Sequence, residues 1–449
     1  MPLEGLRVLE LGQLIAGPFA CAMLASFGAE VIKLEPPGLG DPLRRWRKLY
    51  QGTSLWWRVM GRNKRSVTVD LRDPRGQALV KRMVARGEID ILVENFRPGR
   101  MERWGLGWDA LHALDPRLIM VRVSGWGQDG PRAREPGFAN VAEAAAGLRY
   151  LTGEPGRAPV RSGVSIGDSL AGLHAAYGAL AAVHHRDARG TGEGQLVDVA
   201  LSESIFNMME SLLPEYDVFG HVRRRSGAKL EGIAPTGTYR CAASASEQAG
   251  HVPLSGEPDA EYDGEPDAEC DAECDAECDA ECDAECDAGH DDQYIVIGAN
   301  SDAMFVRLMD AIGRPDLARD PRFAHNDGRV RGEAEIDAAI ERWTRARSRT
   351  DALQTLRAAE VACGSIHSIA DIARDPQFVA RGSFEEVALP GDPDGRAVKI
   401  PAPVPKLGQT PGQTRWLGPE LGQDTREVLR RLAGLDGDEL AALADAGVI

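Results

Sequence analysis

The sequence contains no long run of apolar residues. Its apolar stretches stay below the roughly 18 residues that a membrane-spanning helix needs. The first residues, Met1 to Leu6, also lack the basic region and the apolar core of a secretory signal peptide. We therefore expect a cytoplasmic protein with no membrane partner.

Cysteine is scarce outside one segment. Of the eight cysteines, Cys21, Cys241 and Cys363 stand singly, and the others lie between residues 270 and 286. Isolated cysteines give no disulfide framework, and this usage is typical of a reducing compartment. With 449 residues, of which 43% are hydrophobic and 27% charged, the chain is that of a globular protein with about two domains.

Negative charge is concentrated in one tract. Residues 242–293 hold 19 Asp and Glu and no Lys or Arg. Removing those 19 charges from the formal total of −17 leaves the rest of the chain at +2. The negative net charge therefore belongs to this tract and does not indicate what the rest of the chain binds.

Within this tract the tetrapeptide Asp-Ala-Glu-Cys is repeated five times, from Asp267 to Cys286. In a helix this period places like charges at i and i+4, where they repel. In the repeat, no apolar residue larger than Cys or Ala drives burial, so we expect 242–293 to be a disordered low-complexity insert. Metal binding by the thiolates and carboxylates is the alternative, although five cysteines at C-x-x-x-C spacing without a His partner match no zinc pattern.

The N-terminal half predicts a parallel α/β sheet. Residues 6–11 and 29–35 are expected strands around a helix at 19–27, which makes a βαβ unit with a right-handed crossover. The turn at 12–18 lacks G-x-G-x-x-G, so nicotinamide binding is only weakly indicated, but its small residues leave amides free for a phosphate or a pantetheine carbonyl. Further strands are expected within 63–72 and at 89–94, 118–125 and 196–201.

A polar and aromatic loop follows the expected strand at 89–94. Asn95, Phe96 and Arg97 come directly after it, and Arg103 lies about one helical turn beyond. In open α/β sheets ligands bind at the carboxyl ends of strands. Two guanidinium groups and an aromatic ring suit the phosphates and the adenine of a nucleotide. A solvated basic loop is the alternative.

A single carboxylate, Asp168, stands between a stretch of small residues at 162–167 and an expected helix at 170–185. The small neighbours leave room for a bulky ligand, and a helix N-terminus favours an ionised, nucleophilic carboxylate. The alternative is that Asp168 is only an N-cap. Beyond it, a helix at 202–213 is expected to lead out of this domain.

The second region begins near Arg223 and brackets the acidic tract with expected strands at 234–241 and 294–299. A long stretch rich in Pro and Gly, 389–417, is expected to return along the surface. Helices are expected at 303–312, 332–347 and 350–361, with a short one from 370.

Taken together, these landmarks resemble the class III CoA-transferase family (CaiB/BaiF type), whose relatives include formyl-CoA:oxalate transferases and α-methylacyl-CoA racemases. The order and spacing of the resembling stretches are highly specific, and they cover nearly the whole chain outside the acidic tract. These stretches are 9–18, 31–35, 63–65, 94–99, 124–131, the turn at 167–168, and 403–410.

The resemblance implies an α/β fold with a Rossmann-like large domain and a smaller α+β domain, in an interlocked, ring-like homodimer. It implies a large CoA-binding domain with the catalytic aspartate at 1–200, a linker at 201–224 and a small domain at 225–375. Residues 376–449 are then a return linker and a C-terminal segment that completes the large domain.

The resemblance also implies a reaction. Asp168 matches the catalytic aspartate, which attacks a donor acyl-CoA, forms a mixed anhydride and then an aspartyl-CoA thioester, and passes CoA to an acceptor acid. CoA is a substrate, and no permanently bound cofactor or metal is implied. The implied partners are acyl-CoA, small carboxylic acids and a second copy of the chain, with no nucleic acid. Trp46 matches a tryptophan near the substrate pocket of the oxalate enzymes, and the positions matching CoA contacts are Ile15, Ala16, Val69, Arg72, Asn95, Phe96, Arg97 and Arg103.

Two places depart from these relatives. The racemases carry Gly-His-Asp where this chain has Gly137-Phe138-Ala139, and without that His a two-base exchange at an α-carbon is not expected. A glycine-run loop of the oxalate enzymes is replaced by residues 231–236, which favours a small dicarboxylate such as succinate, glutarate or a hydroxylated relative over oxalate. The alternatives are an acyl-CoA racemase or isomerase, and a non-catalytic nucleotide-binding scaffold whose acidic tract is an interaction surface.

Overall fold

The structure is a computed structural model that describes residues 1–242 and 293–449. These residues form two compact units, one of Met1–Arg225 with Ala373–Ile449 and the other within Ser226–Ile372. The sequence had placed the smaller domain at 225–375. The predicted disorder and the alternative metal site of the acidic tract lie outside the described residues, which include only Ala242 and Gln293 of that tract.

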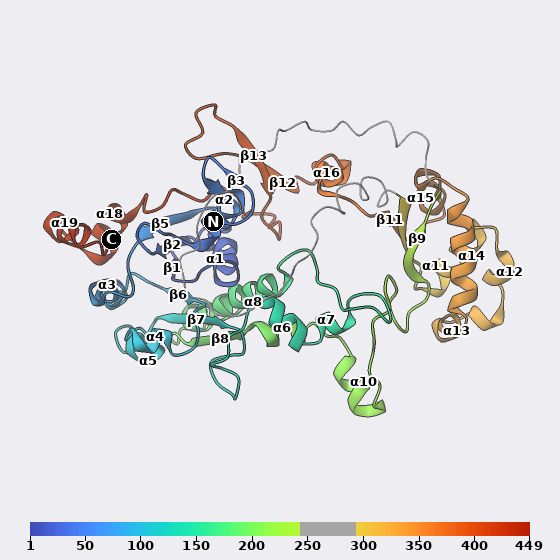
Figure 1. The fold of residues 1–449 in the computed structure, drawn as a ribbon, viewed down its shortest axis with the longest axis horizontal. Coiled ribbons are helices and arrows are strands. Elements are labelled where there is room, and N and C mark those ends of the chain that lie inside the picture. The colour runs from blue at the N-terminus through green and yellow to red at the C-terminus, as the bar shows by residue number, and fades with distance from the viewer. Residues whose placement is uncertain (243–292) are drawn as a thin grey trace, which may run out of the picture. The chain divides into compact units, whose positions relative to one another are not determined.

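A six-stranded parallel sheet forms the centre of the first unit (Figure 1). Its spatial order is β5-β2-β1-β6-β7-β8, so the direction of winding reverses between β1 and β6. The prediction of an α/β fold with a parallel sheet is confirmed. The strands are β1 (Arg7–Glu10), β2 (Glu30–Glu35), β5 (Lys64–Thr68), β6 (Ile91–Glu94), β7 (Ile119–Ser124) and β8 (Leu196–Ala200).

The inner strands are buried on both faces, as parallel strands covered by helices are. Val8, Ile91 and Val121 point into one apolar core, which α1 and α8 complete, while Leu9, Leu92 and Met120 point into the other, which contains α3. The helices of this unit are α1 (Ala16–Ser26), α2 (Leu55–Met60), α3 (Pro74–Ala85), α4 (Arg100–Arg103), α5 (Trp108–His112), α6 (Ala139–Ala145), α7 (Leu148–Leu151), α8 (Ile166–Val183), α9 (Leu201–Phe206), α10 (Leu212–Phe219), α17 (Pro376–Ala380), α18 (Thr425–Val428) and α19 (Gly437–Asp445).

Helices α1 and α8 approach each other closely because their facing side chains are small. A Cβ added at Gly172 would lie 2.8 Å from the carbonyl oxygen of Ala16. Ala171, Ala175 and Ala179 of α8 are buried on the same side. This close approach places the first turn of α8 beside the start of α1.

The C-terminal segment packs onto the outer strand β5 (Figure 1). Thr425 accepts the backbone N–H of Thr68 at 2.9 Å, and the side chain of Asn63 binds the backbone of Gln413 and Arg415. Leu429 and Leu432 lie in the same apolar core as α3. Residues that are distant in sequence therefore close one face of the sheet.

Several predicted boundaries were wrong. Helix α8 begins at Ile166, so Asp168 lies inside it, and α1 begins at Ala16 instead of Phe19. The helix expected at 202–213 is divided into α9 and α10. The stretch 389–417, which was expected to run along the surface, contains the strand β13 (Ala397–Pro401), which pairs with β12 (Phe384–Ala388) just before this stretch. The other short strands of this unit are β3 (Leu49–Tyr50) and β4 (Thr53–Ser54).

The second unit is built on a small antiparallel sheet, β11-β10-β9. Ile295 and Ile297 of β10 pack with Phe305 and Trp343 in a separate apolar core. The strands are β9 (Thr236–Arg240), β10 (Tyr294–Gly298) and β11 (Cys363–Ser365), and the helices are α11 (Asp302–Ala311), α12 (Pro315–Ala318), α13 (Asn326–Arg331), α14 (Glu333–Arg345), α15 (Arg349–Ala358) and α16 (Ile369–Ile372).

Among the described residues, no helix combines the length and the apolar character needed to cross a membrane.

Candidate active site

The two loops beside the reversal of strand order form one wall of a cavity. The loop after β1 contributes Gln13 to Ala16, and the loop after β6 contributes Asn95 to Pro98. In open α/β sheets the carboxyl ends of the strands at this switch point are where ligands bind. The strand order therefore predicts a ligand-binding site at the same edge of the sheet as the sequence pattern does.

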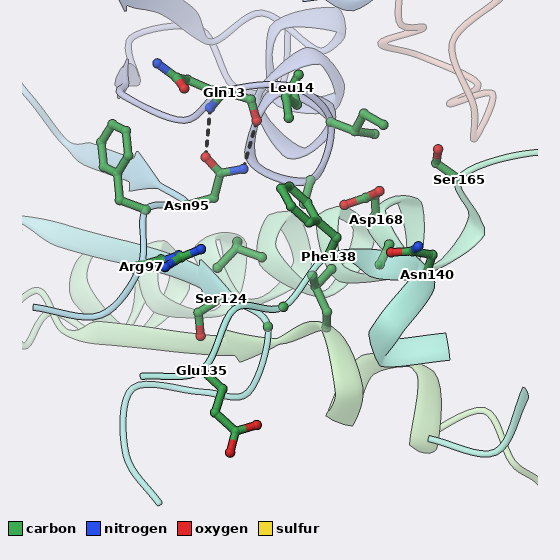
Figure 2. Close-up of a pocket in the computed structure, with 18 of the residues that line it drawn as sticks. Gln13, Leu14, Asn95, Arg97, Ser124, Glu135, Phe138, Asn140, Ser165 and Asp168 are labelled. Atoms are coloured by element: carbon green, nitrogen blue, oxygen red, sulfur yellow. Dashed lines mark hydrogen bonds between the residues drawn. The ribbon is translucent and has the colours of Figure 1, made fainter. Parts of the chain in front are cut away.

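The cavity has a volume of about 560 Å³ and extends from these loops to the first turn of α8. Figure 2 shows Asn95 and Arg97 at one end and Asp168 with Asn140 and Ser165 at the other. The full lining consists of Gln13, Leu14, Ile15, Ala16, Trp46, Asn95, Phe96, Arg97, Pro98, Arg100, Val123, Ser124, Gly125, Glu135, Gly137, Phe138, Ala139, Asn140, Arg161, Ser165, Asp168 and Leu201.

The turn after β1 is held by buried polar groups. Lys33 donates to the carbonyl of Gly12 and forms ion pairs with Asp41 at 2.9 Å and Glu10 at 3.0 Å. Asp41 in turn accepts the backbone N–H of Leu14, whose φ of 64° lies in the left-handed region. A leucine rarely adopts this conformation, so the surrounding bonds must maintain it.

Asp168 is the third residue of α8, so its carboxyl group lies at the N-terminal end of the helix. It is not the N-cap, which removes the alternative interpretation. The N-cap position is Ser165, whose side chain makes no capping bond. Instead, the carboxylate of Glu143, which is 2% exposed, accepts the N–H of Gly167 at 3.2 Å. A cap supplied from α6 therefore allows α8 to begin before Asp168.

Gly167 explains why α8 fits so closely here. An added Cβ would lie 3.0 Å from Ile205 and 3.3 Å from both Ala139 and Glu143. Only a residue without a side chain fits this position unless its neighbours shift. The result is that α6, α8 and α9 meet directly behind Asp168.

The pKa of Asp168 is raised to about 6, first by burial and then by the negative charge of Glu143, while the positive charge of Arg161 opposes the shift. This direction is opposite to the effect expected from the helix N-terminus alone. At neutral pH a carboxyl group with this pKa is still mostly ionised. It is also more basic than an ordinary aspartate, which suits a carboxylate nucleophile.

The opposite end of the cavity is basic and aromatic. Phe96 packs edge-on against Trp104, with ring centroids 5.2 Å apart, and the guanidinium of Arg100 lies 5.7 Å from both rings. Arg97 also lines the cavity. Planar rings and guanidinium groups are the groups that bind a purine and its phosphates.

Most of the predicted site residues come together in this cavity. Asp168, Trp46, Ile15, Ala16, Asn95, Phe96 and Arg97 all line it. Three others do not. Val69 is buried in the apolar core, Arg72 is paired with Asp70 at 2.9 Å, and Arg103 is exposed one turn beyond Arg100. Their roles in binding CoA stay predictions.

Sequence reasoning did not single out three polar residues of the cavity, Gln13, Asn140 and Arg161. Arg161 had a usable signal, because it is a lone cation in a stretch of small residues seven positions before Asp168. Asn140 lies in the first turn of α6 and points to the same end of the cavity as Asp168 (Figure 2).

No histidine is present among the residues that line the cavity. Phe138, at the place where racemases carry a histidine, projects into it close to Asp168 and is 65% exposed (Figure 2). In the part of the chain that the structure describes, no cluster of three or more His, Cys, Asp or Glu side chains is arranged to hold a metal ion. Asp168 is the more enclosed of the two carboxylates that line the cavity, since the other, Glu135, is exposed.

The profile of CoA-transferase family III matches residues 3–246 and 286–425. The chain belongs to this family. It is therefore a class III CoA-transferase, which moves CoA from an acyl-CoA to a carboxylic acid.

Two relatives match the chain along its whole length. Succinyl-CoA–D-citramalate CoA-transferase of Chloroflexus aurantiacus is 44% identical over 450 residues, which cover 100% of this chain and 98% of the relative. The alpha subunit of succinyl-CoA–L-malate CoA-transferase of the same organism is 36% identical over 452 residues, which cover 100% and 93%.

A solved structure is also similar. The CaiB/BaiF family protein of Brucella suis superposes with a TM-score of 0.73 at 30% identity, covering 96% of this chain and 99% of the other. The family that the sequence resembled is thereby confirmed.

Proposed function

We propose that this enzyme transfers CoA from succinyl-CoA, or a similar dicarboxylic acyl-CoA, to a small dicarboxylic acid or a hydroxylated relative of one, with Asp168 as the nucleophile. The observation that carries the proposal is a half-buried carboxylate with a pKa raised to about 6, at a helix N-terminus, in a cavity whose other end is basic and aromatic. Both relatives named above carry succinyl-CoA and a hydroxylated dicarboxylic acid in their names.

In the first half-reaction an Asp168 oxygen attacks the thioester carbonyl of the donor. The C–S bond breaks, CoA leaves as a thiolate, and an acyl-aspartyl anhydride forms. The thiolate then attacks the aspartyl carbonyl carbon, which releases the donor acid and leaves an aspartyl-CoA thioester. No proton, oxidant or reductant is consumed, so a carboxylate and a retained CoA suffice.

The second half-reaction repeats these steps in reverse order. The acceptor carboxylate attacks the aspartyl-CoA carbonyl, expels the thiolate and forms a new anhydride with Asp168. The thiolate attacks the acceptor acyl carbon, and Asp168 is regenerated as a carboxylate. CoA must stay bound throughout, and Phe96, Arg97 and Arg100 at the far end of the cavity provide the groups to retain its nucleotide.

Each step passes through a tetrahedral oxyanion, which hydrogen-bond donors stabilise. The side-chain amide of Asn140 is at the same end of the cavity as Asp168 (Figure 2). The N-terminal end of α8 adds a positive partial charge. We assign these groups to oxyanion stabilisation.

We also propose that the enzyme works as a homodimer. Leu173, Tyr177 and Leu180 on one face of α8 are 43%, 74% and 38% exposed, and Tyr216 and Phe219 of α10 are 58% and 79% exposed. Exposed apolar faces of this kind are typical of subunit interfaces. Sedimentation analysis tests the assembly, and a monomer at micromolar concentration contradicts it.

The free thiols of Cys21 and Cys363 support a reducing compartment such as the cytoplasm.

The chemical proposal is tested by trapping the intermediate. Incubation with succinyl-CoA followed by borohydride or hydroxylamine should modify Asp168, as read by peptide mass spectrometry, and Asp168→Ala should lose at least 10³-fold in kcat. Full activity of Asp168→Ala, or a label at another residue, refutes the mechanism. Deuterium uptake at the substrate α-carbon in D₂O would instead indicate a racemase.

A further inference from the structure

A second, smaller cavity of about 70 Å³ lies behind the active-site cavity. Arg161 lines both cavities, and Arg149, Thr152 and Ser162 line only the smaller one. The reaction proposed above uses none of these residues. The small cavity therefore has no role in the proposed reaction, in which Asp168 is the nucleophile and the basic, aromatic end of the larger cavity holds the nucleotide.

The two arginines beside this cavity differ in their partners. The carboxylate of Glu143 accepts the Gly167 N–H with one oxygen and pairs with Arg149 at 3.3 Å with the other. Arg161 has no hydrogen bond or ion pair within residues 1–242 and 293–449, and its side chain is exposed. One positive charge thus faces the active-site cavity with no carboxylate in ion-pair contact among the described residues, although it is near enough to Asp168 to oppose the rise of that pKa.

An unused donor lies in the same place. The Nε atom of Arg149 is buried and has no hydrogen-bond partner among the described residues. A buried N–H without a partner costs free energy, so a group that accepts its hydrogen bond is favoured there. An Nε–H and a nearby free guanidinium together form a site for a carboxylate.

We propose that Arg161, assisted by Arg149, binds the second carboxylate of the dicarboxylic substrate, the one that does not react. This inference rests on the proposed function and names the residues that select the substrate class. The reacting carboxylate lies at Asp168, and the far carboxylate reaches Arg161, which neutralises its charge.

The same arrangement explains how a doubly charged substrate shares one site with two carboxylates of the protein. A dicarboxylate near Asp168 and Glu143 is repelled by both, and the repulsion is strong where water is excluded. Arg161 offsets this repulsion at the end of the cavity. An acid with a single carboxylate gains nothing from Arg161, so the cation discriminates between substrate classes.

The test compares Arg161→Met with the matched control Arg157→Met, an exposed arginine on the same loop that lines neither cavity. The acceptors are succinate and monomethyl succinate, which have the same chain length and differ by one charge. Assays at pH 8 keep Asp168 ionised in every variant, so a shift of its pKa does not affect the comparison.

We expect Arg161→Met to lower kcat/KM for succinate by about 10- to 100-fold, mainly through KM, and to leave monomethyl succinate within about twofold. Arg161→Lys should restore part of the loss, and Arg157→Met should match the wild type. An equal loss with both acceptors, at an unchanged melting temperature, overturns the proposal. A wild-type enzyme that accepts no dicarboxylic acid refutes the proposed function itself, which is a different outcome.

Discussion

Asn95 and Gln13 hold each other by two reciprocal hydrogen bonds (Figure 2). The backbone N–H of Gln13 donates to Asn95 Oδ1 at 2.7 Å, and Asn95 Nδ2 donates to the Gln13 carbonyl at 2.8 Å. The pair joins the loop after β6 to the loop after β1 across the switch point of the sheet. Asn95, predicted to contact CoA, thus also shapes the wall of the cavity.

The first prediction follows from this clamp. Asn95→Asp keeps an acceptor for the Gln13 N–H but places a carboxylate oxygen against the Gln13 carbonyl, so we expect KM for acyl-CoA to rise by about 10-fold. Asn95→Ala loses both bonds and should destabilise the protein by about 1–3 kcal/mol. Steady-state kinetics and thermal unfolding measure the two effects. Wild-type values for both variants would show that the clamp is unimportant.

The second prediction concerns pH. Because the pKa of Asp168 is about 6, kcat/KM should fall as the pH drops through 6, about 10-fold per unit below it. Glu143→Gln keeps an acceptor for the Gly167 N–H but removes the negative charge that raises this pKa. The acidic limb should then move to lower pH.

Glu135→Gln is the control for the pH experiment, since Glu135 lines the cavity but points away from Asp168 (Figure 2). Its pH profile should match that of the wild type. An acidic limb that stays in place in Glu143→Gln, with activity retained, contradicts the assigned cause of the shift.

The third prediction links the nucleophile to stability. Since the pKa of Asp168 is raised from 3.8 to about 6, the folded state binds more protons than the unfolded state between these values. The contribution of Asp168 to stability therefore decreases as the pH rises through this window, and above it the buried charge is a full cost. Asp168→Asn should raise the free energy of unfolding by about 1–3 kcal/mol at pH 8 and by little at pH 4. A stabilisation equal at both pH values argues against a charge effect.

The fourth prediction concerns the acidic tract. Strands β9 and β10 are antiparallel neighbours, Arg240 pairs with Tyr294, and Cys241 N–H donates to the Gln293 carbonyl at 2.6 Å. A short Asn-Gly link in place of residues 243–292 can therefore join the two strands as a hairpin. We expect this variant to fold and to keep wild-type kcat. A folded but inactive variant would contradict this prediction and show that catalysis needs the tract.

The strands and their order in the chain could be predicted because buried parallel strands appear as short apolar runs, such as Ile119 to Val123. The start of α8 could not, because its cap comes from Glu143 on another helix and leaves no local signal. The split between α9 and α10 did have a signal in Pro214, which lies in the first turn of α10, where proline is tolerated, and which would disrupt the interior of one continuous helix.

The sequence by itself determined the family and the parallel α/β architecture and singled out the carboxylate of Asp168, because these depend on residue types at fixed spacings. Only the tertiary structure decided the environment of that carboxylate. Burial and the charges of Glu143 and Arg161 set its pKa, and residues from three separate elements converge there. The electrostatic environment of Asp168 depends on distances in space between residues that are far apart in the sequence, and no local sequence pattern marks them.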